Sequence, residues 1–324
     1  MNSRIVITDC DHDSIAPEQE VADQYGIDLV YSRSATTEDV IANAEGADGI
    51  VVQYATINAE VLDALPQLKA IGRYGVGVDT VDVDAATSRG VAVSNVPDYG
   101  TEAVSDHAIA LTLTLARGIA RLDRGIRAGS TDFVPVKPLY VIGGRTFGII
   151  GLGLIGSATA RKARGLGYHV IAHDIRYQPG TEVEGVEIVT LTEVLSHSDV
   201  VSLHTPLTAQ TVHLIGAAEL ATMRRDAILV NTSRGGVVDT DALASALARG
   251  GIRGAGLDVH EDEPISPDHP LTAVEDVVLT PHTAWYTEES YFELKRRTIE
   301  NVAQVVTGIR PRDILNPEVL GTVG

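Results

Sequence analysis

The chain has 324 residues, of which 44% are hydrophobic, and its formal net charge is −19. This length suffices for about two domains, and the share of apolar residues excludes a mainly disordered chain. A surface of this charge repels phosphate backbones, so we expect no nucleic acid among its partners.

The cysteine content and the hydropathy pattern indicate the cellular compartment of the protein. Cys10 is the single cysteine, so an intramolecular disulfide and a thiolate metal cluster are excluded, and we expect no metal site. The first residues lack the pattern of a signal peptide, and no apolar stretch approaches the length of a membrane span. The sequence therefore predicts a cytoplasmic protein without a membrane partner.

The first hundred residues alternate short apolar runs with helical patterns. Expected strands lie at 4–8, 28–31, 49–52, 70–72 and 91–93, and expected helices near 18–25, 37–44, 58–64 and 83–88. This alternation predicts a parallel sheet with helices on its faces. The runs are rich in β-branched residues and lack a polar-apolar alternation, which is typical of strands buried on both faces.

A turn-rich break at 96–100 separates this series from a second one. One long helix is expected over about 101–128, followed by a loop over 129–143. Six further strands are expected at 146–150, 169–172, 200–203, 228–231, 254–258 and 277–280, with helices near 155–166, 191–196, 217–222 and 241–249. Strands joined by such crossovers predict a doubly wound sheet. An amphipathic helix over about 288–306 closes the chain.

A glycine-rich turn follows the apolar run at 147–150 and opens a helical pattern. Gly151 permits the tight turn, Gly153 leaves room for a pyrophosphate, and Gly156 lets the helix pack against the strand. The phosphates would then meet the N–H groups at a helix N-terminus. Such a turn can also join a strand to a helix without a ligand, but the strand, the helix and a following acid together favour a dinucleotide.

That acid is Asp174, which ends the next apolar run eighteen residues after Gly156. An acid at this strand end accepts hydrogen bonds from the ribose hydroxyls and repels a 2′-phosphate. The sequence therefore predicts NAD rather than NADP as the cofactor. Arg176, two residues further on, could soften this preference.

Three candidate catalytic residues follow predicted strands of the second series. Arg234 has a guanidinium fork that suits a carboxylate. His282 suits a proton donor, and Glu263 would stabilise its protonated form. Taken singly, Arg234 also suits a salt bridge, Glu263 also suits a solvated loop, and His282 could be one of ten ordinary histidines. Together at the strand ends around one cofactor crevice, they predict a dehydrogenase of keto acids.

Six segments resemble the D-2-hydroxyacid dehydrogenase family. They are GRYGVGVDTVD at 72–82, GLGLIG at 151–156, HTPLT at 204–208, NTSRGGVVD at 231–239, GLDVHEDEP at 256–264 and TPHTAW at 280–285. The resemblance covers nearly the whole chain. Within the family, the chain looks nearest to the phosphoglycerate dehydrogenases and to the C-terminal-binding protein corepressors, and PHTAWYTEES resembles the corepressors in particular.

The resemblance implies a role for each matched residue. Arg234 would bind and polarise the substrate, and His282 would be the general acid and base, with Glu263 paired to it. The implied cofactor-binding residues are Val76, Gly151, Gly153, Leu154, Ile155, Gly156, Asp174, His204, Thr205, Pro206, Thr211, Thr232, Ser233, Arg234, Asp258, His282 and Trp285. The implied substrate-binding residues are Arg73, Tyr74, Gly75, Val76, Gly77, Arg234 and Trp285.

The resemblance also implies an α/β fold of two doubly wound domains. A Rossmann NAD domain at 98–285 would be inserted into a flavodoxin-like substrate domain made of 1–97 and 286–324. Family members usually form dimers through the long helix and loop that correspond to 101–145, so a homodimer is expected.

Two positions bear on the substrate. Gln53 stands where phosphoglycerate dehydrogenases carry an arginine, which weakens the case for a phosphorylated acid. Trp285 matches a corepressor tryptophan that contacts an apolar keto-acid tail, although it also suits a core or interface position. The predicted reaction is hydride transfer between NAD and a small 2-keto or D-2-hydroxy acid. The alternatives are an NAD(H)-sensing protein-interaction module of the C-terminal-binding protein type and another reaction on the same scaffold, such as oxidation of an inorganic anion.

Overall fold

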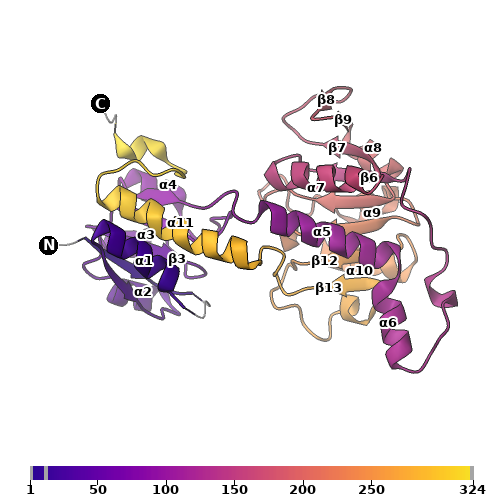
Figure 1. Cartoon of the computed structure of the whole chain (residues 1–324), viewed down its shortest axis with the longest axis horizontal. Helices are drawn as coiled ribbons and strands as arrows, with labels where there is room; N and C mark the ends of the chain where they lie inside the picture. Colours follow the sequence, from indigo (N-terminus) through magenta and orange to yellow (C-terminus); the bar gives the residue numbers. More distant parts are fainter. Residues whose placement is uncertain (1–2, 11–13, 322–324) are drawn as a thin grey trace. The chain divides into compact units, whose positions relative to one another are not determined.

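The computed structural model describes residues 3–10 and 14–321, and the chain groups into two compact units (Figure 1). Unit 1 comprises residues 1–100 and 287–324, and unit 2 comprises 101–286. The first predicted domain boundary, after residue 97, lies three residues from the observed one, and the second, after residue 285, lies one residue from it. The assignment of substrate binding to unit 1 stays a prediction. Among the described helices, none is both long and apolar enough to cross a membrane.

Unit 1 contains one parallel sheet in the order β2-β1-β3-β4-β5. Its strands are β1 (Arg4–Ile7), β2 (Asp28–Tyr31), β3 (Gly49–Val52), β4 (Ala70–Arg73) and β5 (Ala92–Ser94). This is the strand order of flavodoxin-like folds, which confirms the predicted fold of this part of the chain.

Helices cover both faces of this sheet. They are α1 (Ala16–Tyr25) and α11 (Glu288–Val306), side by side on one face (Figure 1), and α2 (Thr37–Asn43), α3 (Ala59–Ala64) and α4 (Val83–Ser88) on the other. The 3-10 helix η4 (Pro317–Leu320) follows α11. α11 packs closely on the strands because Gly49 and Gly72 lack a Cβ, which would lie 2.5 or 2.6 Å from a methyl carbon of Val302.

Unit 2 contains an eight-stranded sheet in the order β13-β12-β11-β10-β6-β7-β9-β8. Its strands are β6 (Thr146–Ile150), β7 (His169–His173), β8 (Glu182–Val183), β9 (Val186–Ile188), β10 (Val200–Leu203), β11 (Ile228–Asn231), β12 (Gly254–Leu257) and β13 (Val277–Leu279). Only the β8–β9 pair is antiparallel, so the other strands end at one common edge. The chain runs outward from β6 on one side and returns to β10 on the other, which confirms the doubly wound Rossmann arrangement.

The helices of unit 2 form two layers around this sheet. One face carries α5 (Thr101–Ala116) and α7 (Leu154–Gly165), which lie side by side (Figure 1), and the other carries α8 (Leu191–His197), α9 (Ala217–Thr222) and α10 (Thr240–Ala248). α6 (Ile119–Arg127) follows α5, and the 3-10 helices are η1 (Val134–Val136), η2 (Gly235–Val237) and η3 (Pro270–Ala273).

One expectation about unit 2 is wrong, and one pair of strands was not expected. The helix predicted over 101–128 is two helices, because Gly118 has φ +61° and a Cβ there would lie 2.7 Å from Cγ1 of Val136. The hairpin β8–β9 was not predicted. Its strands have two and three residues, and its turn places Glu184 and Gly185 at positive φ without the usual Asn-Gly or Asp-Gly signal.

Candidate active site

The glycine turn lies where the sheet of unit 2 reverses its direction of growth. Gly151 follows β6, and His204 and Thr205 follow the neighbouring strand β10. Gly151 has φ +92°, and a Cβ there would lie 2.6 Å from the carbonyl oxygen of His204. Open α/β sheets bind ligands at such a point, because the loops diverge from it to either side.

The turn itself fits a pyrophosphate. A Cβ on Gly156 would collide with the carbonyl oxygen of Gly151, whereas a Cβ on Gly153 would meet no atom within 4 Å. α7 begins with Leu154 and Ile155, and no side chain caps its N-terminus. The first N–H groups of α7 are therefore available to an anion, as NAD requires.

Asp174 follows β7 with its carboxylate buried and hydrogen bonded at both oxygens. Oδ1 accepts from the backbone N–H and from Nε of Arg176, both at 2.9 Å. Oδ2 accepts from the N–H of Leu152 and from Nη2 of Arg176, both at 2.8 Å. The Arg176 side chain, against the opposing effect of burial, lowers the pKa of Asp174 to about 2, and the two backbone N–H groups add to this. The predicted ribose-binding acid is therefore ionised at neutral pH.

Two buried hydroxyls lie at the strand ends beside the turn. Oγ1 of Thr205 and Oγ1 of Thr232 have no hydrogen-bond partner within the described part of the chain. Because buried hydroxyls normally have a partner, these two fit a bound polar ligand such as the dinucleotide. Thr211 braces the loop after β10 instead, since its Oγ1 donates to the carbonyl oxygen of Pro206 at 2.6 Å.

His204 cannot serve as the proton donor of a reaction near neutral pH. Its Nε2 lies 2.9 Å from Oγ of Ser202, and burial lowers the pKa of His204 to about 3. The ring is therefore neutral, and the backbone carbonyl of His204 forms the wall against Gly151.

A histidine and a carboxylate meet in the loops after β13 and β12. Nδ1 of His282 lies 2.8 Å from Oε2 of Glu263, and Oε1 of Glu263 accepts from the N–H of His260 at 3.1 Å. Burial alone would raise the pKa of Glu263, but the hydrogen bond and charge of His282, with the N–H of His260, lower it. The structure therefore brings these two predicted residues together, and Nε2 of His282 is the ring nitrogen left for a substrate.

Asp258 anchors the loop that carries His282, a role that the sequence did not indicate. Its carboxylate is 1% exposed and accepts from Oγ1 of Thr280 at 2.5 Å and from the N–H groups of Thr283 and Ala284 at 3.0 and 2.8 Å. The N–H of His282 donates to the backbone carbonyl of Asp258 at 2.8 Å. The loop needs this support because His282 has φ +51°, which is uncommon for a residue with a side chain.

His107 on α5 is a second residue that sequence reasoning missed. Its Nε2 lies 3.0 Å from Oγ1 of Thr280 and 3.6 Å from Oδ1 of Asp258. The available signal was its position on the buried face of a helix, between the apolar residues Val104 and Leu111.

Arg234 and Trp285 lie in braced loops on the same edge of the sheet. Nδ2 of Asn231 donates to the carbonyl oxygen of Arg234 at 2.9 Å, and Oδ1 of Asn231 accepts from Ser233. Nε1 of Trp285 donates to the carbonyl oxygen of His282 at 3.0 Å. The predicted catalytic residues thus follow β11, β12 and β13, three neighbouring strands.

The predicted substrate loop belongs to unit 1 and follows β4. Gly75 has φ +129°, and a Cβ there would collide with the guanidinium of Arg73. Nδ2 of Asn95 donates to the carbonyl oxygen of Val76 at 2.6 Å, and the loop continues through Gly77. Glycine at 75 therefore lets Arg73 fold over its own loop.

Tyr74 faces the interior of unit 1 rather than this loop. Its side chain is 2% exposed, and its hydroxyl donates to Oε1 of Glu18 at 2.7 Å. Oε2 of Glu18 lies 3.3 Å from Nζ of Lys295 on α11, and both of these residues are completely buried. Burial first, and then the charge of Glu18, raise the pKa of Tyr74 well above its usual value.

Asp9 at the end of β1 was not singled out from the sequence either. Its Oδ1 accepts from the N–H of Gln53 at 3.3 Å, and its Oδ2 accepts from the N–H groups of Tyr54 and Ala55 at 2.6 and 3.2 Å. Asp9 therefore fixes the loop after β3 that contains Gln53.

Comparisons with known proteins agree on one family. The NAD-binding domain of D-isomer specific 2-hydroxyacid dehydrogenases matches residues 109–284. A glyoxylate reductase of Korarchaeum cryptofilum is 42% identical over 308 residues, which cover 93% of this chain and 92% of that protein. A D-3-phosphoglycerate dehydrogenase of Archaeoglobus fulgidus is 37% identical, over 90% of this chain and 55% of that protein. The crystal structure of a glyoxylate reductase from Paecilomyes thermophila matches with a TM-score of 0.87 and 30% identity, over 98% of this chain and 99% of that one.

Proposed function

The chain belongs to the family of D-isomer specific 2-hydroxyacid dehydrogenases, and we propose that its substrate is glyoxylate or a similarly small, unphosphorylated 2-keto acid. Like the family, it is an NAD-dependent oxidoreductase acting on CH–OH donors. The observation that carries the proposed reaction is the pair of His282 and Glu263, 2.8 Å apart on the sheet edge that also holds the glycine turn.

The choice of substrate rests on a relative and on one side chain. The glyoxylate reductase of K. cryptofilum is 42% identical to this chain, against 37% for the A. fulgidus phosphoglycerate dehydrogenase. Gln53 is buried and uncharged at the position where a phosphate-binding arginine is expected in phosphoglycerate dehydrogenases. A site with fewer cations favours a substrate that carries only its carboxylate.

Each proposed residue has one task in the reduction. Bound NADH supplies the hydride that reduces the keto carbon. His282 gives a proton from Nε2 to the carbonyl oxygen, because Glu263 holds Nδ1 and fixes the orientation of the ring. Arg234 offers a guanidinium fork to the substrate carboxylate and carbonyl. Arg73 and the backbone N–H groups of 75–77 are proposed to bind the substrate carboxylate as well.

A panel of keto acids tests this proposal. NADH oxidation is followed with glyoxylate, hydroxypyruvate, phenylpyruvate, 4-methylthio-2-oxobutyrate and 3-phosphohydroxypyruvate. We expect the highest kcat/KM with glyoxylate or hydroxypyruvate, and we expect His282→Asn to lose turnover of them while it binds NADH as before. A preference for 3-phosphohydroxypyruvate, or full turnover by the variant, would contradict the proposal.

We also propose a homodimer. α6 has no buried residue, and apolar side chains are exposed on α6 and on the loop after it: Ile119, Ile126, Phe133, Val134, Tyr140 and Val141. A second copy that covers this segment would remove an unusually apolar surface from water. Light scattering should give twice the chain mass for the native protein and the chain mass for Phe133→Asp/Val141→Asp, with Ile309→Asp as the control. A cytoplasmic location stays a prediction.

A further inference from the structure

The side chain of Arg176 hydrogen bonds to both carboxylate oxygens of Asp174, the acid that is proposed to bind the adenosine ribose. Asp174 accepts four hydrogen bonds, two at each oxygen, and all of them come from Leu152 and Arg176. A carboxylate has about four lone-pair sites, so none is left for a ribose diol. The Arg176 side chain therefore has to leave before the ribose hydroxyls can bind.

Arg176 can leave without disturbing the fold. Its side chain is 55% exposed, against 8% for Asp174. Its other contacts are a hydrogen bond from Nη2 to the carbonyl oxygen of Leu152 at 2.8 Å and a cation–π contact with Tyr177, with the guanidinium carbon 5.2 Å from the ring centroid. All of these contacts lie in the two loops after β6 and β7. An ion pair this exposed contributes little to stability, so its rearrangement costs little.

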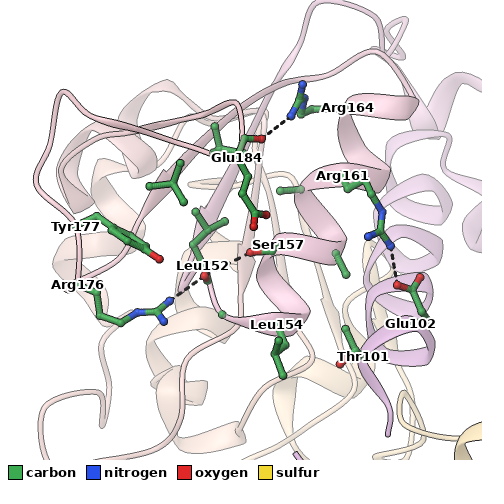
Figure 2. Close-up of a pocket in the computed structure, with 15 residues that line it drawn as sticks. Thr101, Glu102, Leu152, Leu154, Ser157, Arg161, Arg164, Arg176, Tyr177 and Glu184 are labelled. Carbon is green, nitrogen blue, oxygen red and sulfur yellow. Dashed lines mark hydrogen bonds and ion pairs between the residues drawn. The ribbon is translucent and has the colours of Figure 1, made fainter. Parts of the chain in front are cut away.

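A cavity of about 640 Å³ opens beside Arg176 (Figure 2). The glycine turn, the exposed face of α7 and the hairpin β8–β9 form its walls. Figure 2 shows the guanidinium of Arg176 against the carbonyl of Leu152, with Tyr177 next to it. If the ribose binds at Asp174, a substituent on its hydroxyls would therefore enter the cavity that Arg176 lines.

Two other arginines line this cavity, and in the structure they contact groups other than Asp174. Nη2 of Arg161 lies 2.6 Å from Glu102, and Nη1 of Arg164 donates to the backbone carbonyl of Glu184 at 2.9 Å. Glu102 and Glu184 themselves line the cavity and would oppose an anion. Of the cations that line the cavity, Arg176 is the one that contacts Asp174. Whether Asp174 repels a phosphate on the ribose therefore depends on Arg176.

We propose that Arg176 selects the coenzyme by neutralising Asp174 and by pairing with a 2′-phosphate, so that the chain binds NADP(H) as well as NAD(H). A bare acid at this strand end repels a 2′-phosphate, whereas a neutral pair does not. A guanidinium has five N–H donors, so it can keep a hydrogen bond to Asp174 while its other N–H groups form charge-assisted hydrogen bonds with the phosphate oxygens. The preference for NAD alone, which the acid suggests from the sequence, would then not hold.

Calorimetric titration of the full chain with NADH and with NADPH tests the proposal. We expect the two dissociation constants of the native chain to lie within about tenfold of each other. In Arg176→Ala, NADPH should bind about tenfold more weakly or worse, the usual effect of losing a charge-assisted hydrogen bond, while NADH binds equally or more tightly. Arg161→Ala is the matched control, because it removes a cation from the same cavity without touching Asp174, and both constants should stay unchanged.

Three results would overturn the proposal. The native chain could bind NADPH about 100-fold more weakly than NADH. Arg176→Ala could weaken both nucleotides equally, or Arg161→Ala could weaken NADPH as much as Arg176→Ala does. The titrations contain no keto acid, so a failure here is distinct from a failure of the proposed substrate.

Discussion

Replacing Asp258 by Asn tests whether the buried carboxylate positions His282, the proposed catalytic histidine. Asp258 accepts hydrogen bonds from Thr280, Thr283 and Ala284, which fix the loop on both sides of His282. Asn has nearly the same shape but offers one acceptor oxygen and one NH2 group. Its NH2 group must therefore face a backbone N–H that now donates to Oδ1 or Oδ2.

The structure sets the size of the expected effect. One charge-assisted hydrogen bond is lost and one buried N–H is left unpaired, which should lower the free energy of unfolding by about 2–4 kcal/mol. His282 at φ +51° no longer has its full support, so the loop relaxes. A displacement of about 1 Å at a catalytic group costs about 100-fold in rate. We expect kcat to fall by about this factor, with a smaller change in KM.

Urea unfolding and steady-state NADH oxidation with glyoxylate measure the two effects. The matched control is Asp239→Asn, because Asp239 caps α10 by accepting from the N–H of Ala242 at 2.8 Å and Asn caps helices equally well. The control should retain both stability and turnover. If Asp258→Asn keeps kcat within about threefold of the native value while folded, the positioning role is refuted.

Three further predictions follow from charged groups in the two units. Glu263→Gln should lower kcat by about 10–100-fold with little change in the dissociation constant of NADH, and equal turnover by the variant would remove Glu263 from the mechanism. The pKa of Asp174 is lowered to about 2, so the interaction with Arg176 stabilises the fold above about pH 4 and is lost as the pH falls towards 2. Arg176→Ala should therefore lose at most about 1 kcal/mol at pH 7, because Arg176 is more than half exposed, and a gap from the native chain that is as large in urea unfolding near pH 2 as at pH 7 would contradict this. Lys295→Met should destabilise unit 1 by about 3–5 kcal/mol by leaving Glu18 charged and buried, and the double variant Lys295→Met/Glu18→Gln should recover most of the loss in urea unfolding.

The sequence predicted the positions of the candidate residues well because parallel strands leave a clear local signal. Each central strand is a short apolar run, and the first polar residues after it must lie at the carboxyl edge of the sheet. Arg234, Glu263 and His282 all follow such runs, and β11, β12 and β13 are neighbours, so their loops share one region. The glycine turn was also predictable from local sequence, because its three glycines lie within six residues directly after an apolar run, although the close contact of Gly151 with His204 is tertiary.

The sequence could not predict the groups that hold these residues in place. Asp258 and His107 meet at Thr280, far apart along the chain, and no local pattern encodes such a pairing. The hydrogen bonds between Arg176 and Asp174 are local, but two side chains that are two residues apart at a strand end can point toward or away from each other. The break at Gly118 was missed for a related reason: the flanking sequence is helical, and packing against Val136 decides where the glycine takes a left-handed conformation.

In each unit, a buried acid lies directly behind a loop that carries proposed site residues. In unit 2 this is Asp258 behind the loop 280–284, and in unit 1 it is Glu18, which reaches Tyr74 at the start of the loop 74–77. A buried carboxylate is costly for stability unless every oxygen has a partner, and apolar residues of similar size would often be as stable. Each acid, however, accepts hydrogen bonds from a loop or from a side chain next to it, and an apolar residue could not do this. We infer that both acids are retained for loop geometry rather than for stability, and therefore that variants at these two positions should change turnover even where the fold survives.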